Sequence, residues 1–235
     1  MSTPRTARDR VRAEVRGEIL AAARARLAQE GAAALSLRSI ARDLDMAPSA
    51  LYRYFDGRDA ILSALILEAY TSLADQAEAA AAGAAGWSVV PGAMRDWALA
   101  HPHEWGLIFG SPVPGYRAPE ETVVPYARVA GALVRPIAAA HRDGRLRATE
   151  TDTDTDAARS PALDAALDAA LAPVHDALLP GVPGPTVQRA LEAWCTLVGA
   201  ISLEVFGHWR NTVLDPALFF DCTVETLGAQ IGVVA

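Results

Sequence analysis

The residues best suited to bind a charged partner lie between positions 47 and 58. Ser49 and Ala50 follow Pro48, and two tyrosines and an arginine come soon afterwards. Small side chains let a helix approach base edges in a DNA groove, where serine hydrogen-bonds and alanine meets a thymine methyl. Tyrosine hydroxyls and guanidinium groups suit phosphate oxygens. We expect this segment and its flanks to contact DNA through Ser36, Arg38, Ala47, Pro48, Ser49, Ala50, Tyr52, Arg53, Tyr54 and Arg58.

Two short helices must position these residues. Four apolar residues repeat at three- and four-residue spacing and predict the inner face of a first helix, with Ser36 as its N-cap. Leu51 and Phe55 would pack a second helix against the first, and Pro48 suits its first turn. A tight break is expected at Asp45-Met46. The four apolar positions are Leu37, Ile40, Ala41 and Leu44.

Residues 8–62 resemble the helix-turn-helix domain of the TetR/AcrR family of bacterial transcription regulators. The matching positions are Ile40-Ala41, the run Leu51-Tyr52-Arg53-Tyr54-Phe55, and Arg58. Members usually have glycine where Asp45 stands and often a hydroxyl residue where Ala47 stands. Aspartate tolerates the left-handed conformation, so the turn is expected to form, whereas Ala47 lacks a cap and a phosphate contact. The alternative is a helical hairpin that never meets DNA.

Charge is divided unequally along the chain. Residues 1–60 hold 11 arginines against 8 acidic residues, while the other 175 hold 10 against 20, and there is no lysine. An acidic body repels phosphates, so DNA contacts should be confined to the basic head. Its first helix, expected over about residues 9–30 with Val11, Val15, Ile19, Ala23 and Leu27 inward, carries Arg10, Arg12 and Arg16. Arg5 and Arg8 are either mobile DNA contacts or merely solubilising.

The sequence predicts an all-α protein with two domains. Residues 1–62 would form the helix-turn-helix domain, and residues 63–235 an effector-binding and dimerisation domain, connected by a long helix from Arg58 to about residue 82. A mobile loop is expected at about residues 143–160, where threonine and aspartate alternate. Calcium binding there is disfavoured because the glycine turn and distal glutamate of a calcium loop are missing.

An aromatic stripe in the second domain is the candidate effector site. Its residues recur every four positions but are interrupted by Pro102, which predicts two short helices meeting at a kink. This region is similar to a TetR subclass marked by Trp, His-Pro and Gly, here Trp97, His101-Pro102 and Gly110, which implies a small-molecule cavity. Core packing is the alternative for the aromatic residues. His101 and His103 could also ligate a metal or haem, for which the favoured alternative is a structural bond from His101 to a nearby carbonyl. The predicted effector-binding residues are Trp97, His101, Trp105, Phe109, Tyr126 and Trp194.

The same resemblance implies a homodimer formed largely by the last two helices. A two-fold dimer reads a palindromic operator, which gives more specificity than a single head. Gly199 and Gly207 would allow two helices to approach closely, either between chains or within one chain. The predicted dimer-interface residues are Leu191, Val198, Ile201, Val205, Phe219 and Leu227.

Other chemistries find little support in the sequence. No nucleophile-base pair, metal-ligand spacing or glycine-rich phosphate loop stands out, so no cofactor or metal is predicted. Cys195 and Cys222 are interpreted as buried free thiols, with a redox disulfide as the alternative. Neither a signal peptide nor an uninterrupted apolar span of membrane length is apparent, which indicates a cytoplasmic protein.

These features lead to the hypothesis of a ligand-responsive repressor. The dimer would bind a palindromic operator and be released by a small apolar effector. Two alternatives remain. One is an all-helical enzyme acting through His101, Glu104 or His208; the other is a constitutive DNA-binding factor without an effector.

Overall fold

The computed structural model describes residues 6–83, 86–147 and 160–233, and within these ranges it contains helices and no strands. The predicted all-α fold is therefore confirmed. The chain divides into two compact units. Unit 1 comprises the residues up to Tyr70 together with His103–Val123, and unit 2 comprises Thr71–Pro102 and the residues from Val124 onward.

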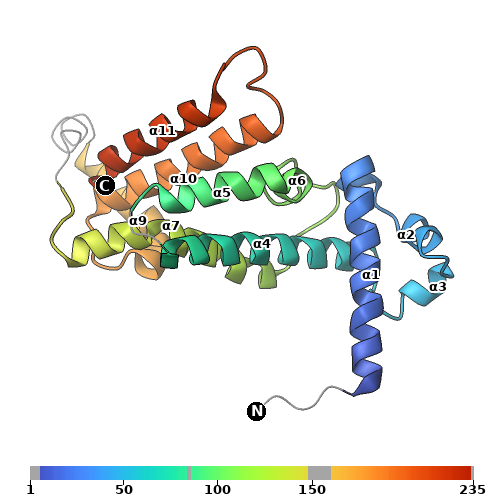
Figure 1. Ribbon diagram of the computed structural model, residues 1–235. Coiled ribbons are helices and arrows are strands. Elements are labelled where there is room, and N and C mark those ends of the chain that lie inside the picture. The colour runs from blue at the N-terminus through green and yellow to red at the C-terminus, as the bar shows by residue number, and fades with distance from the viewer. Residues whose placement is uncertain (1–5, 84–85, 148–159, 234–235) are drawn as a thin grey trace. The chain divides into compact units, whose positions relative to one another are not determined.

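Unit 1 contains the helix-turn-helix. Figure 1 shows α2 and α3 beside the long α1. Within or entering this unit are α1 (Ala7–Glu30), η1 (Ala32–Ala34), α2 (Leu37–Asp43), α3 (Pro48–Leu51), the first half of α4 (Arg58–Gly83), α6 (Pro102–Phe109) and η2 (Glu120–Thr122).

Helix α1 begins and ends where its residue types dictate. Thr6 and Asp9 form a reciprocal capping box at its start, and Gly31, with φ 75°, stops it after Glu30. The predicted inner stripe is only partly correct. Its last three members are buried, but Val11 is 57% exposed, because the apolar core of unit 1 reaches only as far along α1 as Val15.

The core of unit 1 draws on residues beyond position 62. Leu107, Val113 and Tyr116, from α6 and the following loop, pack against the cluster formed by α1 to α4. The Tyr116 hydroxyl lies 3.0 Å from Ser63 Oγ. The predicted boundary at residue 62 concerns function and remains a prediction, but the folding unit that contains the helix-turn-helix is larger than the first 62 residues.

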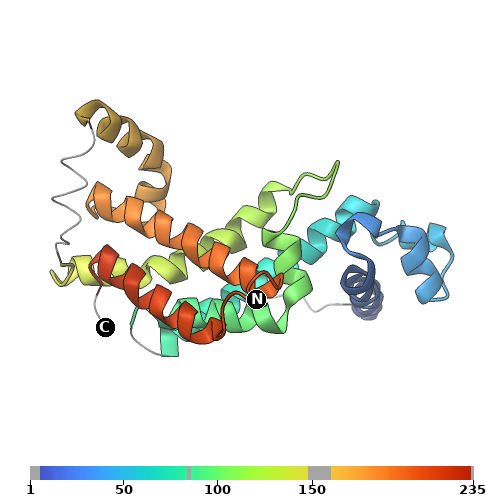
Figure 2. The same ribbon diagram turned by 90° about the horizontal axis from the view of Figure 1, so that it is seen from above.

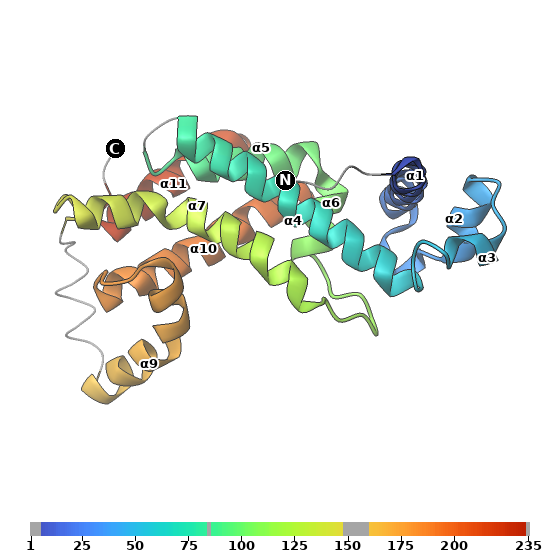
Figure 3. The same cartoon turned by 90° about the horizontal axis from the view of Figure 1, so that it is seen from below.

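Unit 2 is a bundle of longer helices. Figures 1 and 2 show α10 and α11 side by side, and Figure 3 shows α9 against the first part of α10. Buried residues such as Met94, Leu133 and Leu197 form its core. Besides the second half of α4, its helices are α5 (Val89–Ala100), α7 (Val123–Arg142), α9 (Pro161–Leu178), α10 (Gly184–Val205) and α11 (Pro216–Ile231).

Proline positions explain three features of these helices. The predicted break before Pro102 is confirmed, since α5 ends at Ala100 and α6 begins at Pro102. Pro136 lies inside α7 without ending it, so this segment is one helix. Pro216 opens α11 as predicted, and the Asp215 carboxylate caps it by accepting from the Leu218 amide at 3.0 Å.

The apolar stripe of α9 is less covered than its periodicity predicts. Leu163 is 55% exposed, and Leu167, Leu171, Val174 and Leu178 are only half-buried. The predicted loop at about 143–160, including its acidic run, lies mostly outside the described residues. Its described start, residues 143–147, is held by a bond from the Arg147 amide to Gly232 O at 3.1 Å.

One stretch, Glu120–Arg142, is long and apolar enough to cross a membrane by length and composition. This differs from the expectation that no such span exists. The stretch contains Arg128 and Arg135, and 39% of its apolar window is buried inside the protein. Core helices of soluble proteins meet the same criteria, and α7 buries Val129, Leu133 and Ile137.

Candidate nucleic-acid interface

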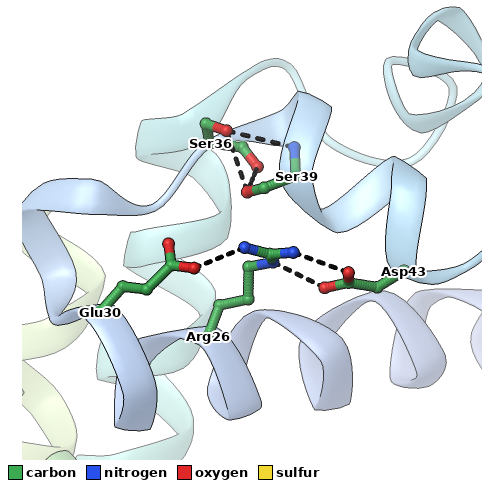
Figure 4. Close-up of polar contacts among 5 residues, drawn as sticks. All are labelled: Arg26, Glu30, Ser36, Ser39 and Asp43. Atoms are coloured by element: carbon green, nitrogen blue, oxygen red, sulfur yellow. Dashed lines mark hydrogen bonds and ion pairs between the residues drawn. The ribbon is translucent and has the colours of Figure 1, made fainter.

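The turn between α2 and α3 has the geometry of a helix-turn-helix. Asp45 has a positive φ of 51°, as the sequence predicted for the position usually held by glycine. The Met46 amide donates to Ala41 O at 2.9 Å and closes the end of α2. Ser36 caps the other end, since its hydroxyl oxygen accepts from the Ser39 amide at 3.2 Å (Figure 4). Both ends of α2 are therefore fixed.

Helix α3 presents a small exposed surface on a buried base. Leu51 and Phe55 are buried as predicted, and Ala47 is an N-cap without a side-chain bond. The residues predicted to contact DNA differ in exposure. Pro48, Ser49, Tyr52 and Arg53 are exposed, as are Arg38, Ser36 and Ala47, whereas Ala50 and Tyr54 are half-buried.

A three-residue ion network holds α2 against α1. Figure 4 shows the Arg26 guanidinium between the carboxylates of Asp43 and Glu30. Arg26 donates to both Asp43 oxygens at 2.6 and 2.7 Å and to Glu30 at 2.6 Å. The hydrogen bond from Arg26 lowers the pKa of Asp43. Sequence reasoning missed this network, because Arg26 and Asp43 are 17 residues apart and no local pattern pairs them.

Arg58 is tied to the protein itself. Its guanidinium donates to Ala32 O at 2.9 Å and Ala33 O at 3.2 Å, which joins the start of α4 to η1. Its Nε is buried without a hydrogen-bond partner among the described residues. Arg58 remains a predicted DNA contact, but the structure gives its guanidinium an internal role that the family resemblance does not indicate.

The six predicted effector-binding residues form three ring pairs. In unit 2, Trp97 stacks on His101 at 4.9 Å between ring centroids, and Tyr126 meets Trp194 edge-on at 5.6 Å. In unit 1, Trp105 lies 4.4 Å from Phe109. Trp97 and Trp105 are fully buried and belong to the cores of their units, whereas Tyr126 is 37% exposed.

His101 has the structural role that was its alternative. Its Nδ1 lies 2.9 Å from Trp97 O, and since a carbonyl only accepts, Nδ1 carries the proton. The Trp97 indole in turn donates to Ser72 Oγ at 3.0 Å. The bond between His101 and Trp97 thereby closes the end of α5, and the bond between Trp97 and Ser72 anchors α5 to α4.

A cavity of about 240 Å³ lies elsewhere in unit 2. None of the six aromatic residues lines it. The Trp87 indole donates to Val224 O at 2.8 Å, which holds this wall in place. Residues lining the cavity include Trp87, Val90, Arg135, Ala139, Arg145 and Val233.

The predicted dimer-interface residues are not equally accessible. Ile201 and Leu227 are buried within their own chain, Leu191, Val198 and Val205 are half-buried, and Phe219 is 45% exposed. Cys195 and Cys222 are free and exposed, so the expectation that they are buried is wrong; both lie on outward faces of α10 and α11. The sequence did not single out other exposed apolar residues at the end of α10, in the connection that follows it and at the start of α11, namely Leu203, Phe206, Leu214 and Leu218.

A capped helix-turn-helix and a helical bundle in one chain are typical of a class of protein, the DNA-binding transcription regulators. Two family models match the chain. One, described as bacterial regulatory proteins of the tetR family, matches residues 19–65, and the other, a tetracyclin repressor-like C-terminal domain, matches residues 89–227. The chain therefore belongs to the TetR family of bacterial transcription regulators. It is a regulator and not an enzyme.

Individual relatives agree with this assignment. The HTH-type transcriptional regulator Mb1846 of Mycobacterium bovis is 38% identical over 230 residues, which cover 94% of this chain and 93% of the relative. The crystal structure of the regulatory protein SCO4313 has a TM-score of 0.77 at 38% identity and covers 96% and 98% of the two chains. A TetR-family regulator from Marinobacter aquaeolei VT8, at 14% identity and a TM-score of 0.60, shares the fold.

Family membership carries general properties with it. TetR-family regulators bind DNA and form dimers. Membership of a family of transcription regulators also implies a soluble cytoplasmic protein. The subclass marked by Trp, His-Pro and Gly remains a prediction.

Proposed function

We propose that this regulator is a ligand-responsive repressor whose dimer binds a palindromic operator and is released by a small effector. The observation that carries the proposal is the exposed surface of α3, where Ser49, Tyr52 and Arg53 project from a base held by Leu51 and Phe55. A short helix with small and phosphate-binding side chains, held on its buried side by Leu51 and Phe55, is suited to a major groove.

Replacing Arg53 by alanine tests the DNA-reading surface. If Arg53 binds a phosphate, Arg53→Ala weakens binding to all sequences and lowers the slope of log affinity against log salt by about 1. Duplexes selected by the wild-type protein from a random library provide the probe, in gel-shift titrations at several salt concentrations. Arg142→Ala, which removes an equally exposed charge at the end of α7, is the matched control. Unchanged affinity of Arg53→Ala would contradict the proposal.

The cavity in unit 2 supports the effector part of the proposal. Its volume of about 240 Å³ and its wall of Trp87, Val90 and Val233 suit a small apolar body. Two arginines also line it, of which Arg145 pairs with Asp143 at 2.6 Å, while Arg135 has no ion pair with a described residue. We therefore expect an apolar effector that also carries an anionic group.

Thermal shift against a panel of matched carboxylates and alcohols tests this effector class. A carboxylate that binds the folded protein raises the melting temperature and releases the selected duplex, whereas its alcohol does so more weakly. Arg135→Ala should remove the preference for the carboxylate, and Ala139→Leu should fill the cavity and reduce binding of both. If the melting temperatures of wild type and Ala139→Leu shift equally, the effector does not bind in this cavity. The predicted aromatic residues would then be the candidate site, and a ligand would have to separate their packed rings.

A further inference from the structure

Two arginines of α1 donate hydrogen bonds to the chain that leaves α3. Arg16 Nη1 lies 2.9 Å from Tyr54 O, and Arg12 Nη2 lies 3.2 Å from Arg53 O. Arg12 and Arg16 are four residues apart, so they occupy the same face of α1. They bind two successive carbonyls more than 35 residues away in sequence.

These carbonyls belong to the segment that follows the last hydrogen-bonded turn after α3. Helix α3 ends at Leu51, and the amides of Tyr54 and Phe55 both bond back to Leu51 O, at 2.9 and 3.0 Å. The carbonyls of Arg53 and Tyr54 come two and three residues after the end of α3. An arginine side chain can bind such carbonyls, as it commonly does for the last carbonyls of a helix.

Arg16 makes a second contact that Arg12 lacks. Its guanidinium carbon lies 3.9 Å from the centre of the Phe55 ring, which is itself buried in the core of unit 1. A planar guanidinium can donate in its plane and stack through its face at the same time, and a lysine ammonium cannot. Arg16 therefore restrains two consecutive residues, Tyr54 through its carbonyl and Phe55 through its ring.

We propose that Arg16 is a positioning residue for DNA reading, which orients Arg53 and Tyr54 by holding the end of α3, and that it is not a phosphate contact. The charge pattern alone places Arg16 among the basic residues of the head, where a phosphate contact is the simplest assignment. The geometry assigns it to the protein's own backbone instead. The proposal rests on α3 being the DNA-reading helix.

The two roles predict different responses in the full-length protein. A lost phosphate contact weakens specific and non-specific binding alike and lowers the salt slope by about 0.9. A lost positioning residue leaves the charge of Arg53 beside the DNA but misorients the reading surface, so it weakens binding to the selected duplex by about tenfold and changes binding to a scrambled duplex and the salt slope much less. We expect the second pattern for Arg16→Ala. Arg16→Lys, which keeps the charge but cannot stack and donate together, should recover only part of the affinity.

Arg10→Ala is the matched control, because Arg10 is exposed on the same helix and its replacement removes the same charge. It should leave the ratio of specific to non-specific affinity unchanged. Arg53→Ala separates the two proposals. If Arg53→Ala weakens binding and Arg16→Ala does not, the role of Arg16 is overturned while the DNA-reading surface stands. If neither does, both are overturned.

Hydrogen-deuterium exchange tests the positioning role without DNA and controls for misfolding. In Arg16→Ala, amides of residues 52–56 should exchange faster, while those of Ile19, Leu20 and Ala23 in the buried part of α1 keep wild-type rates. Uniformly faster exchange across unit 1 would mean that Arg16 serves folding in general, and would overturn the positioning role. Unchanged exchange at 52–56 would overturn it too.

Discussion

Asp45 makes the turn of the helix-turn-helix at a position that most side chains disfavour. With φ 51°, its backbone is left-handed, a conformation in which a Cβ atom crowds the following carbonyl. Aspartate and asparagine tolerate this region better than other residues that carry a side chain, and Asn211 adopts it too, at φ 61°. Asp45 thus keeps the turn but adds strain that glycine would not.

Asp45→Gly should therefore stabilise the protein. We expect a gain of up to about 1 kcal/mol in the free energy of unfolding, reduced by the greater entropy of glycine in the unfolded chain. Asp45→Val should lower stability, because a branched side chain fits this region poorly. Urea denaturation measures both. A loss of stability in Asp45→Gly would mean that the aspartate side chain contributes more than its backbone strain costs.

A second residue-scale prediction concerns acid stability. Arg128 donates to Glu78 at 2.6 and 2.9 Å, and this hydrogen bond lowers the pKa of Glu78. A carboxyl with a lower pKa in the folded state stabilises the protein above its unfolded pKa, about 4.3. That contribution is lost as the pH falls through the folded-state value.

Glu78→Gln should accordingly show a shallower fall in stability below about pH 4.3. Urea midpoints at pH 7, 5, 4 and 3.5 give the comparison. Glu225→Gln, an exposed residue of α11, is the control and should follow the wild-type curve. Identical curves for Glu78→Gln and wild type would show that solvent screening cancels the contribution of this half-exposed pair.

At the scale of elements, one ion pair joins α5 to α10. Arg95 donates to both oxygens of Glu204 at 2.6 and 2.7 Å, and the two side chains are only 16% and 14% exposed. Arg95 also lies over the ring of Phe220 in α11, at 5.6 Å. Because these groups are largely removed from water, losing one partner leaves the other charge poorly compensated.

Glu204→Gln should lower the free energy of unfolding by about 2 kcal/mol, the loss typical of hydrogen bonds to charged groups. The double variant Arg95→Met with Glu204→Leu should lose less than the sum of the losses of Arg95→Met alone and Glu204→Leu alone, since it leaves no unpaired charge. Denaturation of the wild type, these two single variants and the double variant completes the cycle. Additive losses would mean that the pair is not coupled.

At the scale of the whole molecule, apolar residues remain exposed around the end of α10 and the start of α11. Phe206, Leu214, Leu218 and Phe219 are each at least 45% exposed. Family members form dimers, and a two-fold interface uses the same patch on both chains. These residues are therefore our candidates for the surface that a second copy covers.

Phe219→Asp should shift the protein from dimer to monomer and weaken its binding to a palindromic duplex at low protein concentration. Light scattering coupled to size-exclusion chromatography measures the first effect, and gel-shift titration the second. Leu163→Asp, at a 55% exposed position of α9 outside the predicted interface, is the control and should remain dimeric. A dimeric Phe219→Asp would move the interface to another surface.

Local patterns were enough to predict the helical architecture. Apolar residues at helical spacing and terminal signals such as Ser36, Gly31 and the Asp215-Pro216 pair located most helices, because capping and periodicity act over a few residues. Predictions about burial were weaker. Val11, Leu163 and the two cysteines have suitable patterns or residue types but lie where no other element of the chain covers them.

The sequence by itself determined an all-α regulator with a DNA-reading helix and a basic head, since residue type and short-range spacing carry that information. Only the tertiary structure decided what individual side chains do. In the sequence, Arg16 is one of the basic residues of the head and Arg58 is a predicted DNA contact, yet in the structure both bind backbone carbonyls far along the chain. The same guanidinium serves either role, and the choice depends on which acceptor the folded chain brings within about 3 Å.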